Sequence, residues 1–242
     1  MPLVKLGATT STNDFLKELA VNQSLENFTV VTAESQTQGR GQMGAKWISE
    51  SGKNLIMSVL VNNGISDINH IFDLNVGTTL AVFDVLHSLG TPQLAIKWPN
   101  DIMSGSKKVG GILIENSIRS NGDIISILGL GINVNQTDFD LLPNASSLCV
   151  VINKEIDRDA LLESLLVELK LSINRIGVNH TNSWDNYCAK LFRKSIPSVF
   201  EDRSGARFMG MISNVLRNGR LQVQMEDGTE KTFDIKEIKM LF

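Results

Sequence analysis

The sequence predicts an α+β fold: a mixed, largely antiparallel sheet with flanking helices, followed by a small all-β unit. Three observations predict it. Most expected strands adjoin one another as hairpins, which does not fit the strict alternation of strand and helix in a doubly wound sheet. Two long helical stretches are visible, enough to cover one face of a sheet. Residues 205–242 show no helical periodicity, and the turn dipeptides Asn218-Gly219 and Asp227-Gly228 separate short alternating stretches there. We expect a larger domain over residues 1–190 and a smaller one over residues 191–242.

The first ninety residues predict two helices, two strands and a loop. Ser11-Thr12-Asn13-Asp14 precedes apolar residues at helical spacing, which marks a helix start. The β-branched stretches 28–33 and 54–61 predict strands. Residues 34–47 between them are polar and contain three glycines, which indicates a mobile loop. Residues 71–89 carry a broad apolar stripe and predict a long helix.

The middle of the chain predicts three further strands and a second long helix. Residues 94–98 alternate between apolar and polar side chains. Residues 109–115 and 124–134 are two more strands, and Asn121-Gly122 between them is a strong hairpin signal. Residues 160–176 have helical periodicity. These strands and helices complete the larger domain.

Composition and charge limit the classes of function. The chain has 242 residues, of which 42% are hydrophobic and 20% charged, as in an ordinary globular protein with a real core. A net charge of −3 argues against a general nucleic-acid binder. Cys149 and Cys188 have no Cys or His at metal-ligand spacing, which favours two plain thiols in a reducing compartment. No signal peptide and no 18-residue apolar window is visible, so we expect a cytoplasmic protein without a membrane span.

A glycine-rich loop is the first candidate for ligand binding. Residues 39–44 match the dinucleotide fingerprint G-x-G-x-x-G, but polar residues precede them and no helical stripe follows, so the match is accidental. Gly44 is followed by Ala45-Lys46-Trp47, which excludes a P-loop. The functional interpretation is a flexible loop whose amides and Arg40 close over an anionic ligand. A glycine-rich surface turn is an equally good interpretation of the residues alone.

The segment Lys97-Trp98-Pro99-Asn100-Asp101 is the second candidate. Pro99 disfavours helical angles at Trp98, so we expect the strand to stay extended to its end. Alternation places Lys97 on the face opposite Leu94, Ile96 and Trp98. A lysine followed by an amide and a carboxylate can reach phosphate and a Mg²⁺ shell. The alternative is a salt-bridged strand end.

Two strands with paired glycines are the third candidate. Lys107-Lys108 stands directly before a strand that contains Gly110-Gly111, and glycines inside a strand often mark the close approach of a ligand or another backbone. In the strand 129–133, alternation places Gly129, Gly131 and Asn133 on one face. That face has almost no side chains, so a bulky ring can lie on it. The alternative is tight packing against a helix.

Other catalytic chemistries have little support in the sequence. It contains three histidines, His70, His87 and His180, and no Gly-x-Ser-x-Gly elbow, which argues against a Ser-His-Asp hydrolase. No zinc-ligand pattern is present.

Together, these motifs resemble the biotin protein ligases, also called holocarboxylase synthetases. The resemblance covers roughly residues 8–135, and the motifs occur in the family's order. The motifs are Ser11-Thr12-Asn13, Gln36-x-x-Gly39-Arg40-Gly41, Trp47, Lys97-Trp98-Pro99-Asn100-Asp101, Lys108 to Glu115, and Gly129-x-Gly131-Ile132-Asn133. The resemblance implies a class II synthetase-like catalytic domain, and the small β tail fits the family's C-terminal SH3-like β-barrel.

The resemblance also implies an ATP-dependent ligase that forms carbon–nitrogen bonds. The biotin carboxylate would attack the α-phosphate of ATP to give biotinyl-5′-AMP, and a lysine of a biotin carboxyl carrier domain would then accept biotin. Mg²⁺ would accompany ATP. The implied catalytic residues are Lys108, Arg40 and Lys97. Biotin or the adenylate would contact Ser11, Thr12, Asn13, Gln36, Arg40, Gly41, Gln42, Lys108, Gly111, Gly129 and Gly131. The implied nucleotide residues are Trp47, Asn133 and Asn100, with Asp101 for magnesium.

The chain departs from the family pattern at two places. Some members have a basic residue where this chain has Gln42, and a neutral side chain there would loosen retention of the adenylate. Other members carry an N-terminal helix-turn-helix, whereas ten residues precede Ser11 here, so we expect no specific DNA binding. Family members include monomers and dimers, which leaves a homodimer open. A lipoate-attaching ligase or transferase of the same architecture and a non-enzymatic biotin sensor are the alternatives.

Overall fold

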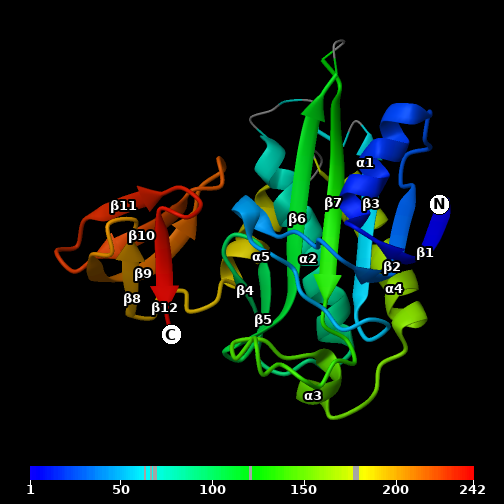
Figure 1. Ribbon diagram of the computed structural model, residues 1–242. Coiled ribbons are helices and arrows are strands. Elements are labelled where there is room, and N and C mark those ends of the chain that lie inside the picture. Colours follow the sequence, from blue (N-terminus) through cyan, green and yellow to red (C-terminus); the bar gives the residue numbers. More distant parts are fainter. Residues whose placement is uncertain (63, 66, 68–69, 120–121, 177–179) are drawn as a thin grey trace.

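The computed structural model describes every residue except 63, 66, 68–69, 120–121 and 177–179 (Figure 1). The chain forms a seven-stranded and a five-stranded sheet, which lie side by side. The strands of the larger sheet are β1 (Leu3–Thr9), β2 (Val30–Gln36), β3 (Leu55–Asn62), β4 (Leu94–Lys97), β5 (Asp101–Ser104), β6 (Lys107–Ile118) and β7 (Ile124–Ile132). Their order is β1-β2-β3-β7-β6-β5-β4. The first pair is parallel and the other pairs are antiparallel, so the predicted mixed, largely antiparallel sheet is confirmed.

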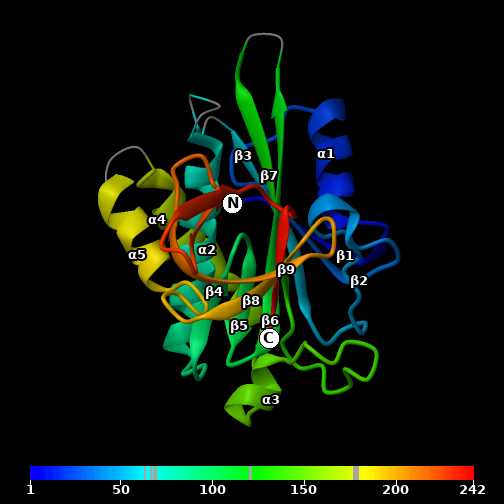
Figure 2. The same ribbon diagram turned by 90° about the vertical axis from the view of Figure 1, so that its left-hand side faces the viewer.

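Helices cover both faces of the larger sheet. They are α1 (Thr12–Asn22), α2 (Ile71–Ser88), α3 (Leu148–Ile152), α4 (Arg158–Asn174) and α5 (His180–Ala189). Seen from the side of the smaller sheet, α2, α4 and α5 lie on one side and α1 on the other (Figure 2). Leu16 of α1 packs on Val31, Leu60 and Ile127, a small core of its own. The main core lies under α2 and α4, so the α1 face is thinly covered and has room for a site.

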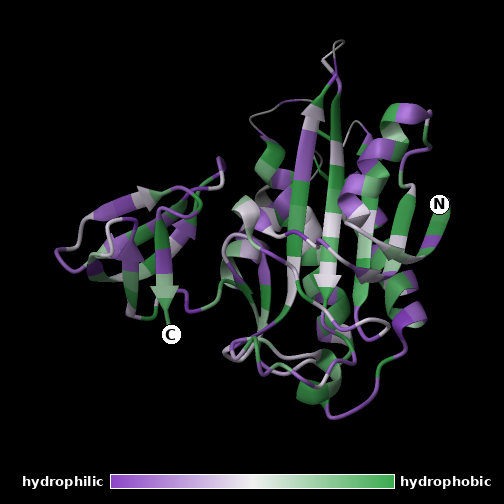
Figure 3. Cartoon of the chain, in the orientation of Figure 1, coloured by the Kyte–Doolittle hydropathy of each residue, from purple (hydrophilic) through white to green (hydrophobic). Residues whose placement is uncertain are grey.

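The β7 strand shows why the chain separates these two faces. Leu128, Leu130 and Ile132 are buried in the main core, and hydrophobic residues are concentrated on such strands of the larger sheet (Figure 3). Because side chains alternate along a strand, Gly129 and Gly131 face α1. The predicted glycine face of this strand is therefore confirmed.

The C-terminal strands form the smaller sheet. They are β8 (Ser198–Asp202), β9 (Arg207–Val215), β10 (Leu221–Met225), β11 (Glu230–Phe233) and β12 (Ile238–Leu241), in the order β11-β10-β9-β8-β12 with antiparallel pairs. The predicted all-β unit is confirmed. Among the pairings of the described residues, none joins β11 to β12, so the expected barrel is an open sheet.

Several predicted elements differ in the structure. Strand β2 begins at Val30 and continues to Gln36, so Gln36 belongs to a strand rather than to the loop. Trp98 is part of the turn between β4 and β5, and not the end of an extended strand. Strands β1 and β5 and helices α3 and α5 were not predicted. Asn121 of the predicted hairpin turn lies outside the described residues, while Ile118 and Ile124 pair on either side of it.

The two sheets contact each other through a tight turn that contains Gly219. The Trp98 indole Nε1 donates a hydrogen bond to the Gly219 carbonyl oxygen at 2.9 Å. A Cβ atom at Gly219 would lie 2.3 Å from Cδ2 of Phe72 on α2. The turn therefore reaches its place only because its residue has no side chain. This contact ties the smaller sheet to the hairpin that carries Lys97 and Asp101.

We predict that Gly219→Ala loosens the contact between the two sheets. Gly228 is the matched control, because its φ of +80° is close to the +85° of Gly219 but no atom lies within 4 Å of its missing Cβ. Backbone strain is common to both variants, so their difference measures the clash with Phe72. Gly219→Ala should lower the free energy of unfolding by about 1–3 kcal/mol more than Gly228→Ala in chemical denaturation. Equal losses would show that Phe72 yields without cost.

Candidate functional site

A cavity of about 580 Å³ lies between the α1 face of the larger sheet and the smaller sheet. This volume is typical of pockets that hold small molecules and cofactors. The sequence-predicted site residues that line it are Ser11, Thr12, Asn13, Gln36, Arg40, Gly41, Gln42, Trp47, Lys97, Asn100, Asp101, Lys108, Gly111, Gly129 and Gly131. Asn133 is not among the lining residues. The structure thus brings together motifs that are up to 120 residues apart in the chain, from Ser11 to Gly131.

The strand register places the charged residues and two glycines in one row. Across the sheet, Lys97 pairs with Asp101, Asp101 with Gly111, Gly111 with Gly131, and Gly131 with Ile56. Residues directly opposite each other in neighbouring strands point to the same face. Lys97 and Asp101 therefore stand at one end of this row, and the next two residues of the row, Gly111 and Gly131, have no side chains.

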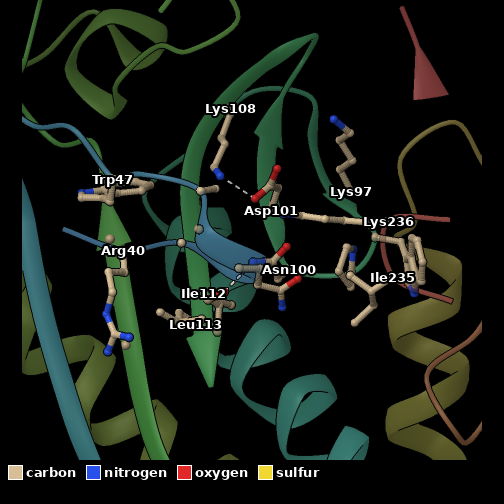
Figure 4. A pocket seen from close by; sticks show the side chains of 18 of the residues that line it. Arg40, Trp47, Lys97, Asn100, Asp101, Lys108, Ile112, Leu113, Ile235 and Lys236 are labelled. Carbon is tan, nitrogen blue, oxygen red and sulfur yellow. Dashed lines mark hydrogen bonds and ion pairs between the residues drawn. The ribbon is translucent and has the colours of Figure 1, made fainter. Parts of the chain in front are cut away.

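An irregularity in the sheet brings Lys108 to the same face. Lys108 and Gly111 are three apart, which on a regular strand places them on opposite faces. The register between β5 and β6 shifts between Ile102 and Met103, as in a β-bulge, and changes the direction of the side chains. Lys108 Nζ lies 2.6 Å from Asp101 Oδ1, and 3.0 Å from where a Cβ of Gly111 would lie. Figure 4 shows Lys108 and Asp101 directed toward each other in the pocket.

Lys97 is a half-buried lysine of the site. Burial lowers the pKa of its ammonium group, and the neighbouring cations Lys108 and Lys239 act in the same direction, whereas Asp101 opposes them. Its Nζ also lies 4.7 Å from the centroid of the Phe242 ring. Because like charges at Lys97, Lys108 and Lys239 raise one another's free energy, an anion placed among them would be stabilised.

The bare positions of β7 are occupied by the protein's own side chains. A Cβ at Gly131 would lie 2.5 Å from ring atoms of Trp47, and one at Gly129 would lie 2.4 Å from Oδ1 of Asn13. In this structure the indole of Trp47 lies over Gly131, and Lys108 Nζ lies 5.6 Å from the centroid of its ring. That a ligand ring lies on this face stays a prediction. The glycines let the glycine loop and the first turn of α1 approach the sheet, and both still border the cavity.

A polar network connects the start of α1 to the sheet. The Thr12 amide donates to Gln36 Oε1 at 2.7 Å, and the Ser11 hydroxyl caps the helix by accepting from the Asp14 amide. Asn13 Oδ1 accepts from the fully buried Ser58 hydroxyl at 2.6 Å. The Thr12 amide and the Ser11 hydroxyl are therefore engaged within the protein. Ser58 was missed because a lone serine in an apolar strand carries no motif.

Arg40 is paired with two carboxylates. Its Nη2 donates to Asp14 Oδ1 and lies 3.1 Å from Glu115 Oε2. Asn13 Nδ2 donates to the same Glu115 oxygen at 2.8 Å. The guanidinium that was expected to close over an anion is thus held at the start of α1, and in Figure 4 it points away from Lys108.

Two asparagine side chains, those of Asn100 and Asn133, donate hydrogen bonds to backbone carbonyl oxygens. The Asn100 side-chain amide donates to the Ile112 carbonyl, and the Ile112 amide donates to the Asn100 carbonyl at 3.0 Å. The Asn133 side-chain amide donates to the Ser146 carbonyl at 2.9 Å, and Asn133 is buried. Asn133 holds the segment that follows β7 and lies outside the cavity lining, so its place on the nucleotide side stays a prediction.

The smaller sheet supplies one side of the cavity, although none of its residues belongs to a recognised sequence motif. The contributing segments are residues 200–203 and 235–240. They include Lys236 and Lys239, on a turn and a strand without any recognisable motif. The second side of the pocket thus comes from a part of the chain with no predicted site residue.

Two other features, a metal-binding cluster and a membrane-spanning helix, are absent from the described residues. The described residues contain no group of three or more His, Cys, Asp or Glu side chains arranged to hold a metal ion. In the same part of the chain, none of the helices is both long and apolar enough to cross a membrane. The cavity is the candidate functional site.

Comparison with known proteins agrees with this architecture. The biotin/lipoate A/B protein ligase family model matches residues 6–133, a little over half of the chain. The bifunctional ligase/repressor BirA of Bacillus subtilis is 35% identical over 161 residues, which are 65% of this chain and 49% of that protein. A biotin–[acetyl-CoA-carboxylase] ligase of Mycobacterium tuberculosis is 32% identical, over 68% of this chain and 61% of that protein. The chain thus spans about half the length of the Bacillus relatives it matches.

A solved structure shares the whole fold. The biotin protein ligase from Aquifex aeolicus in complex with biotin and ATP has a TM-score of 0.82 at 24% identity, and the match covers 99% of this chain and 98% of that one. Fold and site together define a mixed-sheet protein with a cationic pocket on the α1 face of its larger sheet. The chain belongs to the biotin/lipoate A/B protein ligase family.

We predict that Gly131→Ala displaces the Trp47 indole from the sheet. The added methyl would lie 2.5 Å from the ring, and the loop would have to move away. The free energy of unfolding should fall by about 1–3 kcal/mol, and trypsin should cut faster after Lys46. Gly7→Ala is the control, since no atom lies within 4 Å of its missing Cβ. If both variants were cut at the same rate, Trp47 would not be held by this contact.

Proposed function

We propose that this chain is an ATP-dependent biotin ligase, which forms biotinyl-5′-AMP and then transfers biotin to a lysine of a biotin carboxyl carrier domain. The observation that carries the proposal is the row of Lys97, Asp101, Gly111 and Gly131 on one face of the sheet, with Lys108 beside it and the Trp47 indole packed against the two glycines. Family membership and the names of the Bacillus and Mycobacterium relatives support it.

The proposed first step needs two anions to be brought together. An oxygen of the biotin carboxylate attacks the α-phosphorus of ATP, the bond to the bridging oxygen breaks, and pyrophosphate leaves. Carboxylate and phosphate repel each other, so positive charge placed in advance lowers the barrier. Lys108 and Lys97 are the proposed sources, and Asp101 holds the Lys108 ammonium at 2.6 Å before substrate arrives. In the second step a carrier lysine amine attacks the acyl carbon, AMP leaves and the amine loses a proton.

The proposed place for the polar ring of biotin is the network at the start of α1. Ser11, Thr12, Asn13 and Gln36 line the cavity there, with Gly129 beneath Asn13. Because Gln36 already accepts from the Thr12 amide, a ligand would exchange with the Gln36 side chain rather than fill vacant donors. Ser58 orients Asn13 and Thr12 from behind.

The proposed nucleotide side lies toward Trp47 and the smaller sheet. Trp47, Gly41 and Gln42 belong to the loop that borders the cavity. Arg40 would reach the adenylate only by leaving Asp14 and Glu115. Asn100 would act through the backbone of Ile112. The neutral Gln42 would hold the adenylate less firmly than a cation would.

Magnesium enters the proposal through Asp101 alone. Mg²⁺ in ATP-dependent enzymes often takes one or two carboxylates together with substrate phosphates, so a single aspartate fits such a role. Asp101 would then share its carboxylate between the cation and Lys108. The chemistry that the cation supplies is neutralisation of phosphate charge.

Further parts of the proposal concern the whole protein. The division into a catalytic unit over residues 1–190 and a C-terminal unit over residues 191–242, the cytoplasmic location, the absence of specific DNA binding and a homodimer all stay predictions. Lipoate attachment is the second candidate, because the matching family model includes lipoate ligases. Calorimetry with biotin and with lipoate, each with and without ATP, separates the two: only the true substrate should bind more tightly when ATP is present.

We predict that Lys108→Ala lowers biotin-dependent ATP–pyrophosphate exchange by about 100-fold or more, the scale of losing one charge-stabilising group. Lys107→Ala is the matched control, since Lys107 is exposed, donates a hydrogen bond to the Pro143 carbonyl and lies outside the cavity lining. It should stay within about twofold of wild type. An activity of Lys108→Ala within a factor of three of wild type would remove Lys108 from the mechanism.

We also predict that biotin plus ATP protects the loop from trypsin. The loop offers cutting sites after Arg40 and Lys46, and a loop ordered by a ligand resists cutting. Cutting at both sites should slow several-fold with biotin plus ATP, and lipoate plus ATP is the matched control. Protection by lipoate instead of biotin would favour lipoate attachment. Equal cutting rates with and without either acid would contradict closure of the loop.

A further inference from the structure

The glycine loop, residues 39–47, is held at three places by different parts of the molecule. Arg40 is paired with Asp14 on α1 and Glu115 on β6. Trp47 lies on β7. The middle of the loop is held from the other side of the cavity, where Lys236 Nζ donates a hydrogen bond to the Met43 carbonyl oxygen at 2.7 Å. The loop therefore connects the larger sheet to the smaller one across the pocket.

Both partners of this last bond stand on tight turns. Met43 has a φ of +51° and Gly44 one of +80°, in the left-handed region, so the chain turns sharply at the loop tip. Lys236 has a φ of +65° in the turn between β11 and β12. That turn is stabilised by Arg203 Nε, which donates to the Lys236 carbonyl at 3.3 Å, and by Glu237 Oε2, which accepts from the Asp234 amide at 2.7 Å. The lysine is thus presented by a stabilised turn.

The bond lies at the border of the cavity. Lys236 lines the same pocket as Trp47 (Figure 4). Glu237, Lys239, Gly41 and Gln42 line it as well. The acceptor is a main-chain carbonyl, so the contact does not depend on which side chain stands at Met43. A charged donor makes a stronger hydrogen bond than a neutral one, although exposure to water weakens it here.

We infer that Lys236 is a positioning residue that joins the glycine loop to the smaller sheet, so that the two close over the pocket as one lid and retain the acyl adenylate. The retention part rests on the proposed function; the joining of loop and sheet does not. Lys236 acts through the Met43 carbonyl and not on the reacting atoms. A mixed anhydride reacts with water, so a lid joined on both sides of the pocket would limit its escape and hydrolysis.

The first test uses the ligand-free protein and needs no activity. Lys236→Met keeps the apolar stem and removes the ammonium, whereas Lys236→Arg keeps a charged donor. Lys231→Met is the matched control, because Lys231 is an exposed lysine of β11 outside the cavity lining. Trypsin cutting after Arg40 and Lys46, followed by mass spectrometry, should be about fivefold faster in Lys236→Met, and near wild type in Lys236→Arg and Lys231→Met.

The second test measures retention. With biotin and ATP supplied and a carrier domain present, the amount of adenylate released to solution is compared with the amount of biotin transferred. Lys236→Met should raise the released share about fivefold, and Lys236→Arg should restore it. The KM for the carrier should change little, since the lysine is not assigned to the carrier.

The outcomes separate the two claims. Cutting rates in Lys236→Met equal to those of Lys231→Met would overturn the joining of loop and sheet. Faster cutting with an unchanged released share would overturn the retention role. If no variant, wild type included, formed an adenylate while Lys236→Met was still cut faster, the proposed function would fail and the joined lid would stand.

Discussion

The close approach of other parts of the chain to the bare positions of β7 is the constraint on which the site depends. Asn13 and Trp47 occupy space that a Cβ at Gly129 or Gly131 would fill. These contacts set the height of the first turn of α1 and of the glycine loop above the sheet. Moving the first turn of α1 or the glycine loop away from the sheet would separate its polar groups from Lys97 and Lys108. The glycines thus position the surroundings of a ligand, in addition to any room they leave for it.

The cations of the site differ in how their charge is balanced. Lys108 is paired with Asp101, and Arg40 with Asp14 and Glu115. Pairing holds these groups in place before substrate arrives, and an arriving anion must compete with a carboxylate for each. Lys97 also stands beside Asp101, but burial and two neighbouring lysines lower the pKa of its ammonium. An anion near Lys97 would relieve that repulsion.

The sequence predicted those parts of the fold that have strong periodicity. The long helix α2 and the strands β3, β6 and β7 fell within a few residues of their bounds. Strand β1 was missed because it is an edge strand with most residues exposed or half-exposed, so alternation is weak. Strand β5 has four residues and follows a turn that contains Pro99, which leaves too short a pattern to recognise.

The site was predicted in composition but not in arrangement. The motif residues gather in one cavity, with Asn133 outside its lining. The pairing of Lys108 with Asp101 depends on a register shift between β5 and β6, which local sequence does not specify. Whether Arg40 faces a ligand or two carboxylates depends on contacts from α1 and β6, which are distant in the chain. Contacts of this kind follow from the packed fold, and a motif states only which groups are available.

The smaller sheet has a physical reason to be part of the pocket. The α1 face of the larger sheet is covered by one helix of eleven residues and by the glycine loop. Without the smaller sheet, Lys97 and Lys108 on this face would be open to water. Charges interact more strongly where water is excluded, and a mixed anhydride survives longer there. The Trp98–Gly219 hydrogen bond holds the smaller sheet against the hairpin that carries Lys97, and the Lys236–Met43 hydrogen bond holds the loop against the smaller sheet. The same sheet is therefore bonded to the residues that supply charge and to the loop that covers them, which links exclusion of water to the position of the cations.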